Sequence, residues 1–309
     1  MQIRKIVVGT DFSAGAQSAL EAAIDLAHHS GAEIILVHAT MVQSRDEDAP
    51  FDDSPSEWVH ALDGLASERR AKLAELHQQY ADRGVPISEE LTDAVPAKGV
   101  IDIAEKVGAD LIVVGSHGRS GLMRFLLGSV AMRVVRRSKV SVLAARPRRE
   151  GSDSYRRKIL VPTDFSPASE VAVDLAADLV EPGGSIELAH FWQLPAEAAG
   201  SWAYSDKTLG KHVESLHQLF AEAAEKRGRE LTDVHQRKGI DLHFSHTRTH
   251  PKAGIQGKLE TEPFDLVVIG SSGRRGLKRW LLGSVAESAV RHAPCSVLVA
   301  RGLEQDSEE

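Results

Sequence analysis

The feature that most constrains the fold of this chain is an internal duplication. Three segments recur in the same order, namely KIVVGTDFS at 5–13 as KILVPTDFS at 158–166, DLIVVG at 110–115 as DLVVIG at 265–270, and LLGSVA at 126–131 unchanged at 281–286. Each second copy begins 153 to 155 residues after the first. Chance does not preserve sequence, order and spacing together, so the chain is predicted to contain two copies of one domain.

The length of 309 residues and an apolar content of 42% allow two domain cores. A polar stretch that is poor in apolar residues separates the copies and is typical of an exposed linker. We therefore predict a first domain at 1–147, a linker at 148–155, a second domain at 156–302 and an acidic tail at 303–309.

Charge and cysteine content limit the possible partners and compartment. The net charge is -7, whereas nucleic-acid binding favours a concentrated basic face, so no nucleic-acid partner is expected. The single cysteine, Cys295, cannot form an intrachain disulfide and is predicted to be a small packing residue. No apolar run approaches the roughly 20 residues that span a bilayer, and the sequence begins without a signal-peptide pattern. We expect a cytoplasmic protein with no membrane span.

Short apolar runs alternate with helix-periodic segments in each half, a pattern typical of parallel sheets with crossover helices. The predicted strands are 5–9, 33–39, 88–91, 110–114 and 140–145, then 158–161, 185–191, 241–247, 265–269 and 296–300. The helices expected in the first half are 14–30, 56–83, 100–107 and 130–137. Most of these strands are apolar throughout, so helices should cover both sheet faces. The fold class is therefore α/β, with two similar Rossmann-like domains that each contain a five-stranded, mostly parallel sheet.

A glycine-serine loop follows the fourth strand of each half. The pattern is Gly-x2-Gly-x9-Gly-Ser, formed by Gly115, Gly118, Gly128 and Ser129 and again by Gly270, Gly273, Gly283 and Ser284. Glycines let backbone amides approach a ligand, and a helix that begins at the serine would direct its dipole toward an anion. The loop therefore predicts a phosphate site at the carboxyl ends of the strands. The alternative is a glycine-rich connection with a serine N-cap and no ligand.

With its preceding strand that ends in Thr-Asp-Phe-Ser, this pattern resembles the ATP-binding class of universal stress proteins. The resemblance covers both halves almost end to end and implies an adenine nucleotide alpha hydrolase-like fold. It implies that Asp11 and the backbone around Ala39 hold the adenosine portion. The other positions implied in the first half are Gly9, Thr10, Val114, Gly115, Gly118, Gly128, Ser129 and Val130. Those in the second half are Pro162, Thr163, Asp164, Phe191, Ile269, Gly270, Gly273, Gly283, Ser284 and Val285.

The carboxylates of Asp11 and Asp164 would repel a bare triphosphate. They can accept hydrogen bonds from the base or ribose, or meet phosphate through a divalent ion, and each can also cap the following helix beside its serine. The nine-residue inserts are basic and would either be solvated or neutralise phosphate charge. Their basic residues are Arg119, Arg124, Arg274, Arg275, Lys278 and Arg279.

The two copies differ around the expected base. Pro162 replaces Gly9, and the bulky Phe191, followed by Trp192, replaces Ala39. His117 likewise becomes Ser272. An aromatic ring there could stack on adenine or close the pocket, so the second site is less well defined than the first.

Histidines suggest a metal or a base only weakly. Neighbouring strand positions alternate between faces, so His243 and His246 should point apart, and no cysteine or carboxylate cluster completes a site with His250. His38 and His190 occupy matching strand ends and are interpreted as satisfied, partly buried residues. No nucleophile-base constellation is evident, so no catalytic residue and no protein-held metal are predicted.

These observations favour a stress-response regulator that binds ATP, with Mg²⁺ or Mn²⁺, and is non-catalytic or a slow ATPase. Nucleotide occupancy would control its conformation or partners. The alternatives are a scaffold for interactions or small apolar ligands with a degenerate second site, and a true nucleotide hydrolase. The resemblance also implies an intrachain pseudo-dimer through the last strands, 140–145 and 296–300, and a homodimer of whole chains is possible.

Overall fold

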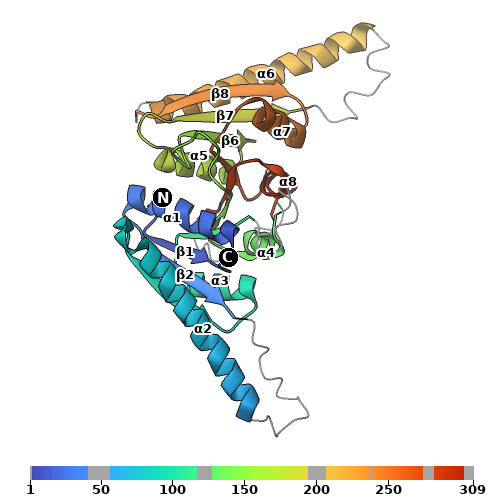
Figure 1. Cartoon of the computed structure of the whole chain (residues 1–309). Coiled ribbons are helices and arrows are strands. Elements are labelled where there is room, and N and C mark those ends of the chain that lie inside the picture. Colours follow the sequence, from blue (N-terminus) through green and yellow to red (C-terminus); the bar gives the residue numbers. More distant parts are fainter. Residues whose placement is uncertain are drawn as a thin grey trace, which may run out of the picture.

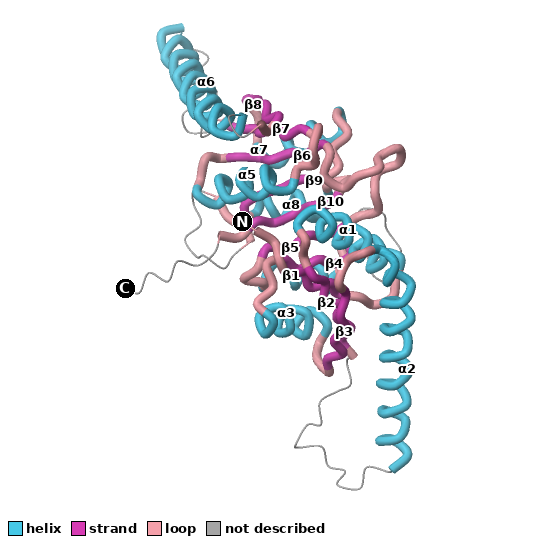
Figure 2. The backbone as a smooth tube through the Cα atoms, turned by 90° about the vertical axis from the view of Figure 1, so that its left-hand side faces the viewer, coloured by secondary structure: helices cyan, strands magenta, loops and turns pink. Residues whose placement is uncertain are grey.

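The computed structural model describes residues 2–40, 56–116, 127–193, 207–236, 239–273 and 282–302, without the side chains of 56–63 and 207–211. Several predicted features lie outside this set, namely His117, Gly118 and the acidic tail. The basic nine-residue inserts of both glycine-serine loops lie outside it as well, except for their last residues, Leu127 and Leu282. The described residues form ten strands in one sheet, with helices packed on both sides (Figures 1 and 2). The α/β fold class and the duplication are therefore confirmed.

The first half alternates strands and helices as the sequence predicts. Its elements are β1 (Lys5–Gly9), α1 (Ala14–Ser30), β2 (Glu33–Ala39), α2 (Ser56–Tyr80), the 3-10 turn η1 (Ala81–Arg83), β3 (Ile87–Thr92), α3 (Pro96–Val107), β4 (Leu111–Gly115), α4 (Ser129–Arg137) and β5 (Ser141–Ala145). The main difference is α3, which begins four residues before the predicted start at Val100. Pro96 occupies its first turn, where a missing N–H costs nothing.

The second half repeats this order. Its elements are β6 (Lys158–Thr163), α5 (Pro167–Leu179), β7 (Ser185–Trp192), α6 (Lys207–Gln236), β8 (Asp241–Arg248), α7 (Pro251–Thr261), β9 (Leu266–Gly270), α8 (Ser284–His292) and β10 (Ser296–Ala300). The long helices α2 and α6 extend past the sheet at opposite ends of the molecule (Figure 1). None of the described helices is both long and apolar enough to cross a bilayer.

The strand order is β3-β2-β1-β4-β5-β10-β9-β6-β7-β8. All neighbours pair in parallel except β5 and β10, which pair antiparallel with Leu298 opposite Leu143. The predicted pairing of the two last strands is therefore confirmed. Within each half, successive strands are added on one side of the first strand and then, from the fourth strand on, on its other side, so the first and fourth strands are parallel neighbours, as β1 and β4 are. Ligands of open parallel sheets bind at this switch point.

Two apolar layers sandwich the sheet. Helices α1, α2 and α5 cover one face with residues such as Leu20, Leu73 and Leu175, while α3, α4, α7 and α8 cover the other with residues such as Val134 and Val290. In the inner strands the side chains alternate between the two layers, so these strands are buried on both faces, unlike the edge strands β3 and β8. This explains why most of the strand sequences are continuously apolar.

The connection between the halves is only partly exposed, which corrects the prediction of an exposed linker at 148–155. Residues 147–151 are exposed, but Tyr155 and its neighbours Ser154 and Arg156 are buried. The Arg156 guanidinium donates to Asp25 of α1 at 2.9 Å and to the Leu179 carbonyl of α5 at 3.0 Å. Arg156, the residue that follows the predicted linker, therefore joins the two halves, because a buried guanidinium needs these acceptors.

Two buried arginines complete the junction symmetrically. Arg146 donates to the Arg291 carbonyl at 3.3 Å, at the end of α8, and Arg301 donates to the Val135 carbonyl at 2.8 Å, near the end of α4. Burial lowers the pKa of both guanidiniums from the ordinary arginine value. Each arginine follows the last strand of one half and contacts a helix C-terminus of the other, where a cation is favoured by the helix dipole.

Candidate functional site

The turn after β1 is built by the side chains of Thr-Asp-Phe-Ser. Thr10 Oγ1 accepts from the Phe12 amide at 3.1 Å, Asp11 Oδ1 accepts from the Ser13 amide at 3.0 Å, and Ser13 Oγ caps α1 by accepting from the Ala16 amide at 3.2 Å. Phe12 has a φ of 64°, a left-handed conformation that is rare for a bulky residue. The turn is thus tightly specified, and Ser13 rather than Asp11 caps the helix, since Asp11 accepts only from the amide of the cap residue.

The second half forms the same turn with the same partners. Its hydrogen bonds run from the Phe165 amide to Thr163 Oγ1, from the Ser166 amide to Asp164 Oδ1 and from the Ser169 amide to Ser166 Oγ. Phe165 also has a positive φ, of 58°. The repeated motif therefore has a structural function in both halves, whatever its role toward a ligand.

The loop after β4 leads into a helix whose first turn has no side-chain cap. Gly128 is the N-cap of α4, its own amide donates to the Ser116 carbonyl at 2.7 Å, and Ser129 is the first helical residue. The alternative of a serine N-cap is therefore wrong, in both halves, since Gly283 precedes α8 in the same way. Because glycine offers no capping oxygen, the first amides of α4 can serve an external acceptor.

Gly115 has a packing role beside this loop. A Cβ on it would lie 2.4 Å from the Gly15 carbonyl oxygen, and one on Gly270 would lie 2.6 Å from the Ala168 carbonyl oxygen. Glycine at both positions lets the first turn of α1 or α5 lie directly against the sheet. These two loop glycines are thus explained without a ligand.

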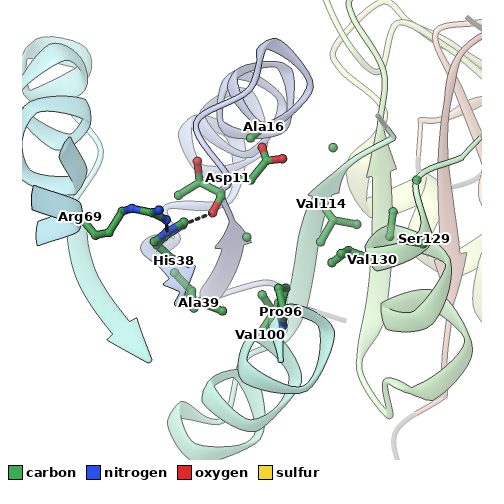
Figure 3. Close-up of a pocket in the computed structure, with 16 residues that line it drawn as sticks. Asp11, Ala16, His38, Ala39, Arg69, Pro96, Val100, Val114, Ser129 and Val130 are labelled. Atoms are coloured by element: carbon green, nitrogen blue, oxygen red, sulfur yellow. Dashed lines mark hydrogen bonds between the residues drawn. The ribbon is translucent and has the colours of Figure 1, made fainter. Parts of the chain in front are cut away.

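The first half encloses a cavity of about 580 Å³ at the switch point. Nine predicted site residues line it, namely Gly9, Thr10, Asp11, Ala39, Val114, Gly115, Gly128, Ser129 and Val130. It is also lined by Ala16, Val37, His38, Arg69, Pro96, Val100 and Ala131. Figure 3 shows Ser129 and Val130 at one end, Pro96 and Val100 along one wall, and Arg69 at the opposite end. The cavity thus joins an uncapped helix N-terminus to an apolar wall.

The sequence analysis missed the apolar wall of Pro96 and Val100, and it also missed Arg69 and the polar role of His38. His38 is buried, its Nδ1 lies 2.7 Å from the Thr10 carbonyl, and its Nε2 lies 3.1 Å from Arg69 Nη1. A carbonyl can only accept and a guanidinium can only donate, so His38 is neutral with its proton on Nδ1. A signal did exist, because Arg69 interrupts the periodic apolar stripe of α2 one turn before the buried Leu73.

The second half differs from the first at the position that corresponds to Ala39. A Cβ on Gly254 would lie 2.2 Å from the ring of Phe191, so this ring lies against the backbone of α7, and Phe191 is only 9% exposed. The Phe191 ring is therefore buried against α7, and its role toward a ligand stays a prediction. The Asp164 carboxylate lies beside the glycine loop, since a Cβ on Gly273 would lie 2.7 Å from Asp164 Oδ2.

The other predicted residues of the second half have the following positions in the part of the chain that the structure describes. Val285 lines a separate groove of about 300 Å³ between α7 and α8, together with Ile255 and Leu259. Thr163 and Ile269 are buried, whereas Ser284 is exposed at the start of α8. Pro162 lies within β6 and Gly270 ends β9.

The three histidines considered as metal ligands have separate partners. His243 Nε2 lies 2.8 Å from Asp241, His246 accepts from Trp192 Nε1 at 3.5 Å, and His250 caps α7. The described residues include no group of three or more histidine, cysteine or acidic side chains that could hold a metal ion.

Fold and site define a class, a tandem doubly wound α/β protein with a ligand-sized cavity at the switch point of its first half. Comparison with known proteins narrows the class. The model of the universal stress protein family matches residues 2–146 and again 156–301, so the chain belongs to this family.

Individual relatives agree with this assignment. A universal stress protein of Methanocaldococcus jannaschii is 35% identical over 150 residues, which are 48% of this chain and 85% of that protein. One of Mycobacterium tuberculosis is 30% identical over 227 residues, 72% of this chain and 71% of that protein. A crystal structure of a universal stress protein from Archaeoglobus fulgidus has a TM-score of 0.67 at 21% identity, covering 97% of this chain and 99% of that one, which supports the fold.

Proposed function

We propose that this protein is an ATP-binding regulator that holds one nucleotide per chain, in the cavity of its first half. The observation that carries the proposal is the combination of an uncapped α4 N-terminus with an apolar wall in one cavity of about 580 Å³. Backbone amides and the helix dipole stabilise phosphates, while Ala39, Pro96 and Val100 offer the apolar surface that a purine needs.

The carboxylate of Asp11 lies on the border of this cavity and already accepts from the Ser13 amide through one oxygen. It can accept from the ribose or the base, and Mg²⁺ or Mn²⁺ would arrive with the phosphates. No nucleophile-base pair is assigned among the lining residues, so occupancy rather than turnover is the proposed output. Occupancy would be relayed to conformation or partners, and α2 can sense it because Arg69 lies on the cavity.

The second half supports a stoichiometry of one. Phe191 fills the space that corresponds to Ala39, and Gly254 and Gly99 occupy equivalent first-turn positions of α7 and α3. Gly254 faces the Phe191 ring, whereas Gly99 faces the side chains of Thr92, Ala39 and Ala94, so the ring has no counterpart in the first half.

Exchanging these residues tests the proposal. Ala39→Phe copies the second-half residue into the first half, where the Thr92 and Ala94 side chains already face Gly99, so the added ring has to extend into the cavity. We expect wild type to bind one equivalent of MgATP in calorimetry and Ala39→Phe to lose at least tenfold in affinity, with a midpoint of thermal unfolding close to wild type. Phe191→Leu is the matched control and should bind one equivalent like wild type. Wild type without measurable MgATP affinity, or Ala39→Phe with unchanged affinity, would contradict the proposal.

A further inference from the structure

The first-half cavity carries a fixed positive charge at the end away from α4. Arg69 reaches this end from α2, a helix that contributes no other residue to the cavity lining among the described residues (Figure 3). Its Nη1 donates to His38 Nε2 at 3.1 Å, and His38 is itself held by the Thr10 carbonyl. A series of two hydrogen bonds thus orients the guanidinium: His38 Nδ1 donates to the Thr10 carbonyl, and Arg69 donates to His38 Nε2.

The same packing forms in the second half without the arginine. Gly84 and Gly239 follow α2 and α6, and the residue fifteen positions earlier is Arg69 in one half and Ala224 in the other. Ala224 is buried, while His190 keeps the bond to the Thr163 carbonyl at 2.7 Å. The fold therefore does not need a cation at this position. The arginine occurs in the half that holds the cavity of about 580 Å³.

The position of Arg69 determines which part of a ligand it can meet. The α4 N-terminus, which favours phosphate, lies at the other end of the cavity (Figure 3). A nucleotide with its phosphates at Ser129 would direct its base past Ala39 toward Arg69. Arginine has only donors, and one of its five serves His38, so the group that it can recognise is an acceptor on the base edge.

We infer that Arg69 is a base-recognition residue, which donates a hydrogen bond to a ring nitrogen of the purine, and that His38 is its positioning residue. This inference rests on the proposed function and adds the group that discriminates among bases. A charged donor to a desolvated acceptor contributes on the order of tenfold or more in affinity.

Paired ligands and a conservative variant test this. Arg69→Met keeps the aliphatic stem and removes the donors, and Arg70→Met changes an exposed neighbour on the same helix. Calorimetry with adenosine and with MgATP should give an equal loss of about tenfold for both ligands in Arg69→Met, and no loss in Arg70→Met. A loss confined to MgATP would place Arg69 on phosphate and overturn the inference.

Deaza analogues identify the atom. One of the 1-, 3- and 7-deaza adenosines should bind wild type about tenfold more weakly than adenosine, yet bind Arg69→Met as adenosine does, which is the signature of a direct pair in a double-mutant cycle. Equal wild-type affinities for all three analogues and adenosine would overturn the inference even if Arg69→Met binds weakly, since ring stacking rather than donation would explain that loss. Wild type that binds neither adenosine nor MgATP would overturn the proposed function and this inference together, whereas normal wild-type binding with unchanged Arg69→Met would overturn only the inference.

Discussion

Cys295 is a residue whose chemistry is controlled by burial. It is 6% exposed at the start of β10, and burial raises the pKa of its thiol to about 12. The thiolate is the reactive form, so at pH 8 nearly all of the group is unreactive, and the thiolate fraction grows only as pH approaches 12. We expect an aromatic disulfide reagent to label native protein at least a hundredfold more slowly than protein unfolded in guanidinium. Comparable rates in the two states would show that the thiol is accessible.

Single residues also mark the limit of what the sequence could predict about the site. The glycines, Asp11 and Ser129 were found because their spacing is repeated, and spacing is visible in one dimension. Arg69 was missed because it joins the cavity through a helix that is remote in sequence, and only its polarity within an apolar stripe indicated a function. The position of the Phe191 ring could not be predicted because it depends on Gly254, whose missing side chain leaves room for the ring against α7.

At the scale of elements, α1 connects stability to the site through its N-cap. Ser13 Oγ accepts from the Ala16 amide, and the Ser13 amide itself donates to Asp11. Ser13→Ala should lower the free energy of unfolding by about 1 kcal/mol, since capping hydroxyls contribute that much. It should also weaken MgATP binding, because Asp11 and the start of α1 border the cavity. Urea unfolding and calorimetry measure the two effects.

The equivalent cap in the second half supplies the control. Ser166→Ala removes the hydroxyl that accepts from the Ser169 amide at 3.4 Å, and should cost similar stability with no change in affinity. An affinity loss in Ser166→Ala equal to that in Ser13→Ala would contradict a site confined to the first half.

Elements were more predictable than their boundaries. All ten strands were predicted, and the inner ones were read from continuous apolar runs, because burial on both faces leaves few polar positions in them. The start of α3 was missed because Pro96 reads as a helix breaker, although proline is favoured in a first turn. The buried end of the linker was missed because Arg156 and Ser154 are polar, and their burial depends on Asp25 and Leu179 from both halves.

At the scale of the whole molecule, the antiparallel pair β5-β10 makes one sheet from two domains. The two strands read SVLAA and SVLVA, so each half presents nearly the same edge to the other. Arg136 of α4 pairs with Glu287 of α8 at 2.6 Å across the junction, and the backbone amides of Arg146 and Arg301 donate to Ser296 and Ser141. Pairing of this kind satisfies strand edges that would otherwise be exposed.

This near identity predicts how an isolated half should behave. Residues 1–147 alone would expose β5, which is fully buried in the whole chain, and a second copy can take the place of β10 because Ser141, Val142 and Leu143 recur there. We expect this fragment to form a two-fold dimer through antiparallel β5 pairing, since exposed apolar edges favour isologous association. Light scattering after size exclusion should give twice the fragment mass at micromolar concentration. A folded fragment, by circular dichroism, that stays monomeric there would mean that Arg156 and the linker end, rather than the strand edge, hold the halves together.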